Sequence, residues 1–343
     1  DAGADAFRFN FSHGTHAEHK ARYDIVRKLS EQKGIHITLI ADMQGPKLRV
    51  GEFKNGQVLL KEGQTFKFDM EEKPGDEQRV TLAHPEIFQA VKAGDELLLN
   101  DGNIRLHVDK CDKKNIWTTV NVGGILSGHK AWVISKLEKP NAINELDEII
   151  KLSDGIMVAR GDLGVECPIQ TVPVLQKRIV SACRRYARPV IIATQMLESM
   201  INNPSPTRAE ASDVATAVYD GADTVMLSAE SAAGKYPVEA VKMMRDIITE
   251  VEADPLFYRS MENSRVHPCC VGESDSITFA ASDIAGVLNK VACIVTYTSS
   301  GLTTFLTARE RPNLPIIAIT PDIVVARRLG IVWGAKSFVN KAS

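Results

Sequence analysis

The sequence lacks the features that mark several large classes of protein. Its six cysteines show no metal-type spacing, with Cys269 and Cys270 adjacent and the others scattered, which fits a reducing cytosol better than a disulfide framework. The formal net charge is −2 and no block of like charge occurs, so neither nucleic acid nor a membrane surface is indicated as a partner. There is no bilayer-length apolar run and no signal peptide. We therefore expect a cytoplasmic protein.

The composition is sufficient for a substantial folded core. At 343 residues and 44% hydrophobic, the chain can form two or three domains. It begins with Asp1 rather than Met, inside what reads as a helix-to-strand turn, so we expect the natural N-terminus to lie upstream. The C-terminal unit, which ends at Ser343, is also expected to be cut short.

One stretch, Asp154–Glu166, indicates the kind of site to look for. An apolar run, Ile156–Ala159, has the length of a buried parallel strand. Arg160, Gly161 and Asp162 follow it, before a helix expected from Thr171 to Tyr186. A carboxylate at the end of a buried strand is stabilised by a nearby cation, and a glycine beside it lets backbone N–H groups approach an anion. The alternative is an ordinary turn with a helix-capping aspartate.

The same layout recurs along the chain, which favours the functional interpretation. Six apolar strands end in polar residues and most are followed by a helix, the rhythm of parallel strands with right-handed crossovers. No Gly-x-Gly-x-x-Gly follows any strand, which argues against a Rossmann sheet. A TIM (β/α)8 barrel predicts functional residues at several strand ends. The expected strands are Ala6–Phe11, Ile37–Ala41, Trp132–Leu137, Ile156–Ala159, Pro189–Ala193 and Asp223–Leu227.

Between the second and third of these strands the sequence changes to short segments in which apolar and polar residues alternate. Gly, Asn and Asp turns separate these segments, which predicts an inserted all-β module. After a weakly periodic stretch, Arg259–Ser276, a smaller α/β unit follows. The predicted organisation is an α/β fold: barrel domain 1–46, β module 47–130, barrel domain 131–258 and C-terminal α/β domain 259–343.

The polar residues at the strand ends can support phosphoryl and enolate chemistry. Glu138 and Asp162 suit a hard cation such as Mg²⁺. Arg8, Arg49 and Lys136 suit a phosphoryl group, whose charge spreads over its equatorial oxygens in the transition state. A metal ion and a lysine would also stabilise an enolate oxygen. Ion pairs that only hold the barrel rim together are possible for any one pair, but not expected for the whole set.

Seven segments in order give the chain a resemblance to pyruvate kinase over nearly its whole length. The resemblance implies transfer of a phosphoryl group from phosphoenolpyruvate to ADP, giving ATP and pyruvate, by a phosphotransferase that uses Mg²⁺ or Mn²⁺. The segments are Phe7–Gly14, Asp42–Arg49, Ile134–Glu138, Asp154–Glu166, Ala193–Met200, Asn203–Glu210 and Val225–Glu230.

The resemblance also implies roles for individual residues. Arg8 and Lys136 would contact the transferring phosphoryl group, with Lys136 stabilising the transition state. Glu138 and Asp162 would hold the divalent ion. The substrate carboxylate would be bound by the Gly161 and Asp162 N–H groups and the Thr194 hydroxyl. Thr194, through water, would lie where the enolate is protonated.

Other implied features lie outside this cluster. Arg49 and Lys130 would approach the nucleotide phosphates, and the β module would close over the site as a lid that excludes water. The family is typically a homotetramer regulated by a phosphorylated effector, here a sugar phosphate or AMP. The loop Thr298, Ser299, Ser300, Gly301 with Thr303 matches the position of the effector's phosphate site, although Ser/Gly turns are common.

The monovalent-cation position departs from many family members. Asn10, Ser12, Asp42 and the backbone of Met43 would ligate K⁺ in members that carry Glu at the position of Lys47. The lysine here resembles the K⁺-independent branch, because a tethered ammonium can supply the charge of K⁺. We expect activity without K⁺; the alternative is that Lys47 is only a surface charge.

The second departure from the family pattern is that two barrel segments are missing from the sequence. After Lys130 the family continues through a glycine-rich turn, another barrel strand and its helix, whereas here Ala131 follows directly. The first barrel strand is also absent before Asp1, which leaves six strands where eight are needed. Either the printed sequence joins two stretches across residues that it omits, which we favour, or the protein lacks them and exposes sheet edges.

Two other functions remain as alternatives. A metal-dependent lyase or aldolase acting through a pyruvate enolate would need Glu138 and Asp162 but not Arg49, Lys130 or a lid. The second is a catalytically degenerate kinase kept as an effector-binding or interaction module, and the presence of Lys136, Glu138, Asp162 and Thr194 argues against it.

Overall fold

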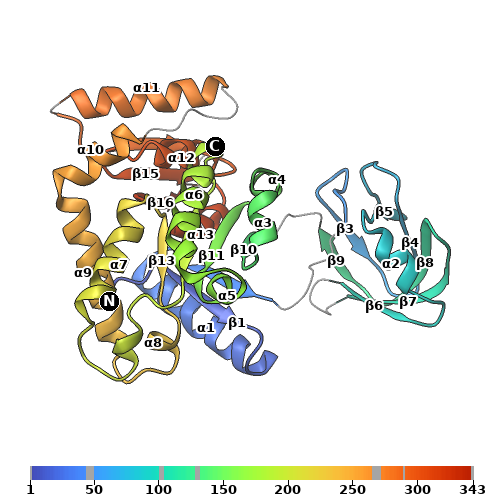
Figure 1. Ribbon diagram of the computed structural model, residues 1–343. Helices are drawn as coiled ribbons and strands as arrows, with labels where there is room; N and C mark the ends of the chain where they lie inside the picture. Colours follow the sequence, from blue (N-terminus) through green and yellow to red (C-terminus); the bar gives the residue numbers. More distant parts are fainter. Residues whose placement is uncertain are drawn as a thin grey trace. The chain divides into compact units, whose positions relative to one another are not determined.

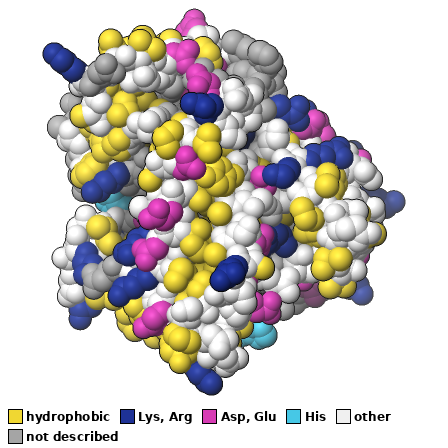
Figure 2. Space-filling view, turned by 60° about the vertical axis from the view of Figure 1, so that its left-hand side comes forward, with side chains coloured by type: hydrophobic (Ala, Val, Ile, Leu, Met, Phe, Trp, Pro, Cys, Tyr) yellow, Lys and Arg dark blue, Asp and Glu magenta, His cyan; other side chains and the backbone are white. Residues whose placement is uncertain are grey.

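The computed structural model describes residues 2–43, 50–99, 104–127, 132–264, 272–288 and 290–340. The chain divides into two compact units, Asp1–Asp42 with Trp132–Ser343, and Met43–Ala131 (Figure 1). Basic and acidic side chains are interspersed on the face shown in Figure 2. Within the described residues no helix is long and apolar enough to cross a membrane.

The larger unit contains the six predicted barrel strands, in two parallel sheets. β1 pairs with β2, so that Asn10 lies opposite Asp42. The other four form a sheet in the order β10-β11-β12-β13. This agrees with a partial barrel in which neighbouring strands are joined by crossovers. The strands are β1 (Ala6–Asn10), β2 (Thr38–Asp42), β10 (Ile134–Leu137), β11 (Gly155–Ala159), β12 (Val190–Ala193) and β13 (Thr224–Met226).

The two central strands are apolar because they are covered on both faces. Every residue of β11 and of β12 is buried, as expected for parallel strands with helices packed over them. Ile156, Val158 and Ile192 are fully buried in the same core as Ile179 of a covering helix. This core fixes the direction in which the strand ends present their polar residues.

The helices largely follow the sequence pattern, with one correction. The helix expected to start at Thr171 is preceded by a separate short helix, Arg160–Glu166, which begins directly after β11. Asp162 therefore lies in a first helical turn and caps nothing with its side chain. The helix that follows Thr207 begins with a capping box, in which the Thr207 hydroxyl accepts from Glu210 N at 3.2 Å and the Glu210 carboxylate accepts from Thr207 N at 2.7 Å. The helices of this part are α1 (His16–Lys33), α3 (Pro140–Asn144), α4 (Leu146–Leu152), α5 (Arg160–Glu166), α6 (Val172–Arg185), α7 (Arg208–Tyr219), α8 (Ala229–Ala232), α9 (Pro237–Ala253) and α10 (Pro255–Asn263).

The C-terminal part of this unit is a second α/β arrangement, a parallel sheet in the order β14-β15-β16. The stretch expected to be a linker, Arg259–Ser276, is partly helical. The end of α10 covers its first residues and the start of α11 covers its last. The final helix and strand carry too weak a pattern to have been predicted. The elements are α11 (Glu273–Val287), β14 (Ile294–Tyr297), α12 (Leu302–Arg309), β15 (Ile316–Thr320), α13 (Ile323–Arg328) and β16 (Ala335–Val339).

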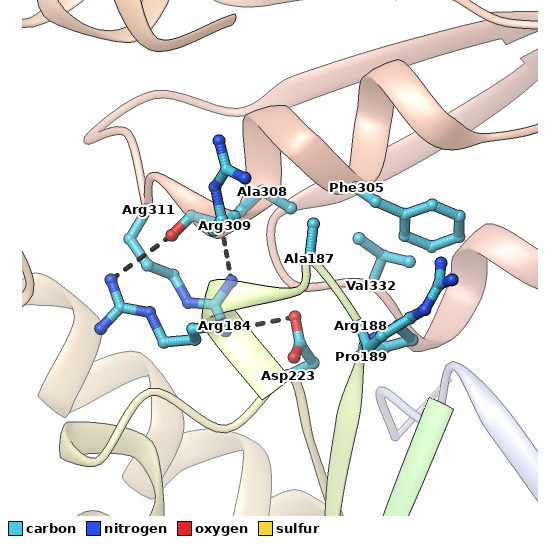
Figure 3. Close-up of a pocket in the computed structure, with 10 residues that line it drawn as sticks. All are labelled: Arg184, Ala187, Arg188, Pro189, Asp223, Phe305, Ala308, Arg309, Arg311 and Val332. Atoms are coloured by element: carbon cyan, nitrogen blue, oxygen red, sulfur yellow. Dashed lines mark hydrogen bonds and ion pairs between the residues drawn. The ribbon is translucent and has the colours of Figure 1, made fainter. Parts of the chain in front are cut away.

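A buried arginine cluster joins the C-terminal part to the barrel strands. Arg311 pairs with Asp223 at 3.1 Å (Figure 3). It also donates to Gly221 O at 2.6 Å and lies over the Trp333 ring. Burial, and then the charge of neighbouring Arg311, lower the pKa of Arg184 to about 10. Asp223 therefore neutralises a site where two guanidinium groups are out of water.

The smaller unit is the predicted all-β module. Its five-stranded sheet has the order β5-β4-β8-β7-β6, and β3 pairs separately with β9. Alternation along β7 and β8 buries Ile104, Leu106 and Ile116 against Phe66 and Phe68. The elements are β3 (Gln57–Leu60), β4 (Thr65–Asp69), β5 (Arg79–Thr81), α2 (Pro85–Ala90), β6 (Glu96–Leu99), β7 (Ile104–Cys111), β8 (Asn115–Val122) and β9 (Gly124–Ser127).

Candidate active site

Two adjacent strand ends bring a guanidinium onto a carboxylate. Arg8 of β1 donates from Nε to Asp42 Oδ2 at 2.8 Å and makes a second contact from Nη2. The side chains are 22% and 13% exposed, so this is a half-buried ion pair with one face open. Arg8 is therefore held in place by β2 while part of its guanidinium remains accessible.

Lys136 extends this pair into a chain of alternating charges. Its Nζ lies 2.5 Å from Glu138 Oε1 and 3.8 Å from Asp42 Oδ2. Because Lys136 belongs to β10 and Asp42 to β2, strands of two separate sheets meet at one rim. The arrangement concentrates two cations and two carboxylates where the sequence predicted phosphoryl chemistry.

The next two strand ends bring Gly161 and Thr194 together. Gly161 N donates to Thr194 Oγ1 at 2.7 Å, and the same hydroxyl donates to Ala193 O at 2.6 Å. Thr194 has a φ of 71°, a left-handed conformation that a β-branched residue rarely adopts. The hydroxyl is thus aimed at the first turn of α5, next to Asp162.

Glu138 and Asp162 are the two carboxylates that the sequence analysis assigns to a divalent ion. They leave neighbouring strands, since Leu137 of β10 lies opposite Val158 of β11, so both carboxylates emerge from the same sheet edge. Asp162 is exposed, and no hydrogen bond or ion pair is found for it in the described part of the chain. Among the described residues no group of three or more His, Cys, Asp or Glu side chains could hold a metal. Two protein carboxylates with substrate and water oxygens is the pattern that Mg²⁺ favours.

The predicted monovalent-cation residues are only partly brought together. Asn10 Oδ1 accepts from Ser12 N at 3.0 Å, and Asn10 lies beside Asp42 in the β1–β2 register. The Asp42 carboxylate faces Arg8 and Lys136. Met43 is 42% exposed. Lys47, Arg49 and Lys130, which were assigned to the cation and nucleotide positions, lie outside the described residues.

Two residues that hold the site were not assigned a role from sequence. Arg160 donates to the backbone of the loop that carries Thr194, at 2.8 Å to Thr194 O. Glu230 is buried and accepts from Ser228 N at 2.7 Å and from Leu197 N at 3.1 Å. In the sequence Glu230 is only the last residue of one of the segments that carry the family resemblance, Val225–Glu230. Only its burial, which the sequence does not reveal, distinguishes it.

Glu210 anchors the same loop from α7. Its carboxylate accepts from Ser199 N at 2.7 Å and from Ser199 Oγ at 2.5 Å. Burial alone would raise the pKa of Glu210, but the hydrogen bonds from Ser199 and Thr207 outweigh it and lower the pKa. The loop that begins at Thr194 is therefore attached at both ends.

The loop proposed for the effector phosphate is a tight strand-to-helix turn between β14 and α12. Thr298 is buried and its hydroxyl accepts from Gly301 N at 2.9 Å. Ser300 Oγ accepts from Leu302 N at 3.4 Å. Gly301 has a φ of 95°, which a side chain would strain, and a Cβ there would lie in tight contact with the Phe305 ring, at 3.1 Å. Ser299 is exposed and Thr303 partly buried.

Comparison with known proteins gives one consistent result. Residues 1–132 and 127–241 match the family model described as pyruvate kinase, barrel domain, and residues 275–343 match pyruvate kinase, alpha/beta domain. A pyruvate kinase of Methylorubrum extorquens is 42% identical, over 99% of this chain and 82% of the relative. One from Geobacillus stearothermophilus is 37% identical, over 97% and 67%. A crystal structure of a pyruvate kinase from Cryptosporidium parvum has a TM-score of 0.71 at 30% identity, over 99% and 83%.

The same comparisons bear on the missing barrel segment. The alignment with the Methylorubrum extorquens relative has 394 positions, 51 more than the 343 residues of this chain. The barrel-domain match also breaks at residues 127–132, where the sequence predicted a missing strand and helix. Neither the lyase nor the degenerate-module alternative is favoured by these matches.

Proposed function

The chain belongs to the pyruvate kinase family, and from this premise we propose the chemical role of each residue at the rim. The reaction moves a phosphoryl group from the enol oxygen of phosphoenolpyruvate to ADP, and the resulting enolate takes a proton at carbon to give pyruvate. The observation that supports this assignment is the row Arg8–Asp42–Lys136–Glu138, which offers two cations at one rim where strands of two sheets meet.

Lys136 and Arg8 act on the phosphoryl group. Both are partly exposed and both are held by carboxylates, so they are oriented before substrate arrives. In the transition state the charge of the transferring group spreads over its equatorial oxygens and negative charge develops on the leaving enolate oxygen, and a nearby ammonium stabilises both. Lys136 is therefore the transition-state residue, and Arg8 a substrate-binding and catalytic residue.

The substrate carboxylate binds at the start of α5. The N–H groups of Gly161 and Asp162 have no intrahelical acceptor because they lie in the first turn. In the structure Gly161 N donates to Thr194 Oγ1, and a carboxylate oxygen would take the place of that hydroxyl. Thr194 Oγ1 then donates to the substrate, and through water it lies where the enolate is protonated.

Glu138 and Asp162 hold the divalent ion, Mg²⁺ or Mn²⁺. When bound, the ion would supply positive charge to the phosphoryl and enolate oxygens. Glu138 contacts Lys136 at 2.5 Å, so the same carboxylate fixes the position of the catalytic ammonium. Asp162, on the next strand end, completes the pair of protein ligands.

Nucleotide binding, the monovalent cation and assembly rest on the family resemblance. Arg49 and Lys130 bind the ADP phosphates, and the β module acts as the lid. Lys47 replaces K⁺ beside Asn10, Ser12, Asp42 and Met43. The enzyme is a cytoplasmic homotetramer whose phosphorylated effector, a sugar phosphate or AMP, binds at the Thr298–Gly301 loop.

A coupled assay tests the proposed function. Purified protein is supplied with phosphoenolpyruvate, ADP and Mg²⁺, and pyruvate is followed through lactate dehydrogenase. Pyruvate formation that requires both ADP and the divalent ion is expected. Pyruvate release without ADP would indicate a lyase, and absence of turnover with every phosphorylated effector would indicate a degenerate module.

A further inference from the structure

Arg160 makes more specific contacts than any other side chain around the candidate site in the described residues. Its guanidinium faces the Asp213 carboxylate on α7, with Nη1–Oδ1 and Nη2–Oδ2 both at 2.7 Å. Nη2 also donates to Thr194 O at 2.8 Å and to Gln195 O at 3.3 Å. One side chain thus ties the start of α5 to α7 and to the loop after β12.

The backbone that Arg160 contacts is unusual. Thr194 and Gln195 have φ values of 71° and 55°. Two consecutive non-glycine residues in the left-handed region are unfavourable and persist only where the surroundings hold them. Their carbonyl oxygens are the ones to which Arg160 donates, so this side chain stabilises the conformation that directs the Thr194 hydroxyl toward Gly161.

The geometry of the contact requires a guanidinium. The Arg160 side chain is 10% exposed and that of Asp213 is 37% exposed, so the guanidinium is largely out of water while the carboxylate that it faces is partly open. A planar fork can face a carboxylate with one edge and carbonyl oxygens with another, whereas a lysine ammonium cannot span both. Asp213 neutralises the charge and fixes the fork.

We propose that Arg160, oriented by Asp213, is a positioning residue for Thr194 in the phosphoryl-transfer and protonation steps. This inference rests on the proposed function, because Thr194 matters only if it binds and protonates the substrate. Arg160 itself does not touch the substrate. Its guanidinium holds the left-handed turn, and the turn sets the position of the Thr194 hydroxyl.

The test compares Arg160→Lys with wild type. We expect kcat to fall by about 100-fold, the cost of a displacement near 1 Å at the reacting groups. The KM for ADP should stay within about twofold, since none of the contacts found for Arg160 among the described residues, which include Asp213 and the Thr194–Gln195 backbone, is with a residue proposed to bind nucleotide. Arg185→Lys is the matched control: Arg185 lies on α6 and pairs with Asp147 at 3.2 Å, away from the Thr194 loop, and should leave kcat unchanged.

A double-mutant cycle separates positioning from general structural support. If Arg160 acts through Thr194, then Arg160→Lys made in a Thr194→Val background should lower kcat by less than about threefold further. Equal falls in both backgrounds, or an unchanged kcat in Arg160→Lys, would overturn the inference. Should Arg160→Lys not fold, Asp213→Asn supplies the same cycle, with a fall in kcat of about 10-fold expected.

The proposed activity and the positioning role of Arg160 would be contradicted by different results. If the wild-type protein forms no pyruvate from phosphoenolpyruvate and ADP, the proposed function is wrong. If wild type is active but Thr194→Val is impaired while Arg160→Lys and Asp213→Asn are not, the function stands and only the positioning role of Arg160 is wrong.

Discussion

Lys136 Nζ lies 3.8 Å from Asp42 Oδ2, and this contact joins two sheets between which the described part of the chain shows no strand pairing. One strand of each sheet contributes a charge to the same rim. Arg8 reaches the same carboxylate oxygen from β1, so Asp42 organises both proposed phosphoryl-binding cations. A single aspartate therefore connects the first and second parts of the barrel chain at the candidate site.

The first prediction concerns K⁺. Because Lys47 is expected to supply the monovalent charge, activity should be the same within about twofold in K⁺ and in tetramethylammonium at equal ionic strength. Lys47→Glu should create a K⁺ requirement. A titration of kcat against K⁺ at fixed chloride concentration measures both.

A strong K⁺ requirement in the wild-type protein would contradict this account of Lys47. Lys61→Glu, a change at an exposed residue of the same β module, is the control for altered charge and should produce no K⁺ dependence.

The second prediction concerns the pH dependence of stability. The pKa of Glu210 is lowered from its ordinary value of 4.5, so the charged carboxylate stabilises the fold. This contribution is fully present above the unfolded pKa and is lost as pH falls through the lower folded pKa. Glu210→Gln should lower Tm by about 2 °C at pH 7.

The check is a series of thermal unfolding scans from pH 7 to pH 3 for both proteins. The difference in Tm should narrow below about pH 4.5, where the wild-type carboxylate becomes protonated. A difference that stays constant down to pH 3 would show that charge at Glu210 is not the source of the stabilisation. Glu239→Gln, at an exposed position in the first turn of α9, is the control.

The third prediction concerns attachment of the C-terminal part to the barrel strands. Asp223 accepts from Val190 N at 3.0 Å and pairs with Arg311 at 3.1 Å. Asp223→Ala leaves buried Arg311 without its carboxylate and Val190 N without its acceptor. The expected loss is about 3 kcal/mol in the free energy of unfolding.

Urea unfolding followed by circular dichroism measures that loss. Asp246→Ala removes an exposed carboxylate that pairs with Arg245 at 2.8 Å, and should cost under about 0.5 kcal/mol. If the two variants unfold at the same urea concentration, the Asp223–Arg311 pair does not hold the C-terminal part.

Much of the fold could be predicted because its signal is local. The buried runs of β11 and β12, the turns of the β module and the capping box at Thr207 are visible in short stretches of sequence. Strand ends of parallel sheets meet at one edge, so Lys136 and Asp42 could be expected near each other.

The remaining features depend on tertiary contacts. Nothing in the residues Thr-Gln predicts two left-handed conformations at Thr194 and Gln195, since neither is a glycine. The structure imposes them through Arg160, whose partner Asp213 lies 53 positions further along the chain. α5 was missed because two glycines in seven residues lower its helix propensity, and its packing compensates.

The most direct test of the account replaces Lys136 with Met and measures two quantities on the same protein: ATP formed from phosphoenolpyruvate and ADP, and Mn²⁺ bound, followed by electron paramagnetic resonance. The account predicts a fall in ATP formation of at least about 1000-fold, with Mn²⁺ affinity retained within a few-fold. Lys151→Met, at an exposed lysine paired with Glu148 at 2.6 Å, should change neither. ATP synthesis by Lys136→Met at the wild-type rate would contradict the central claim that this ammonium stabilises the migrating phosphoryl group.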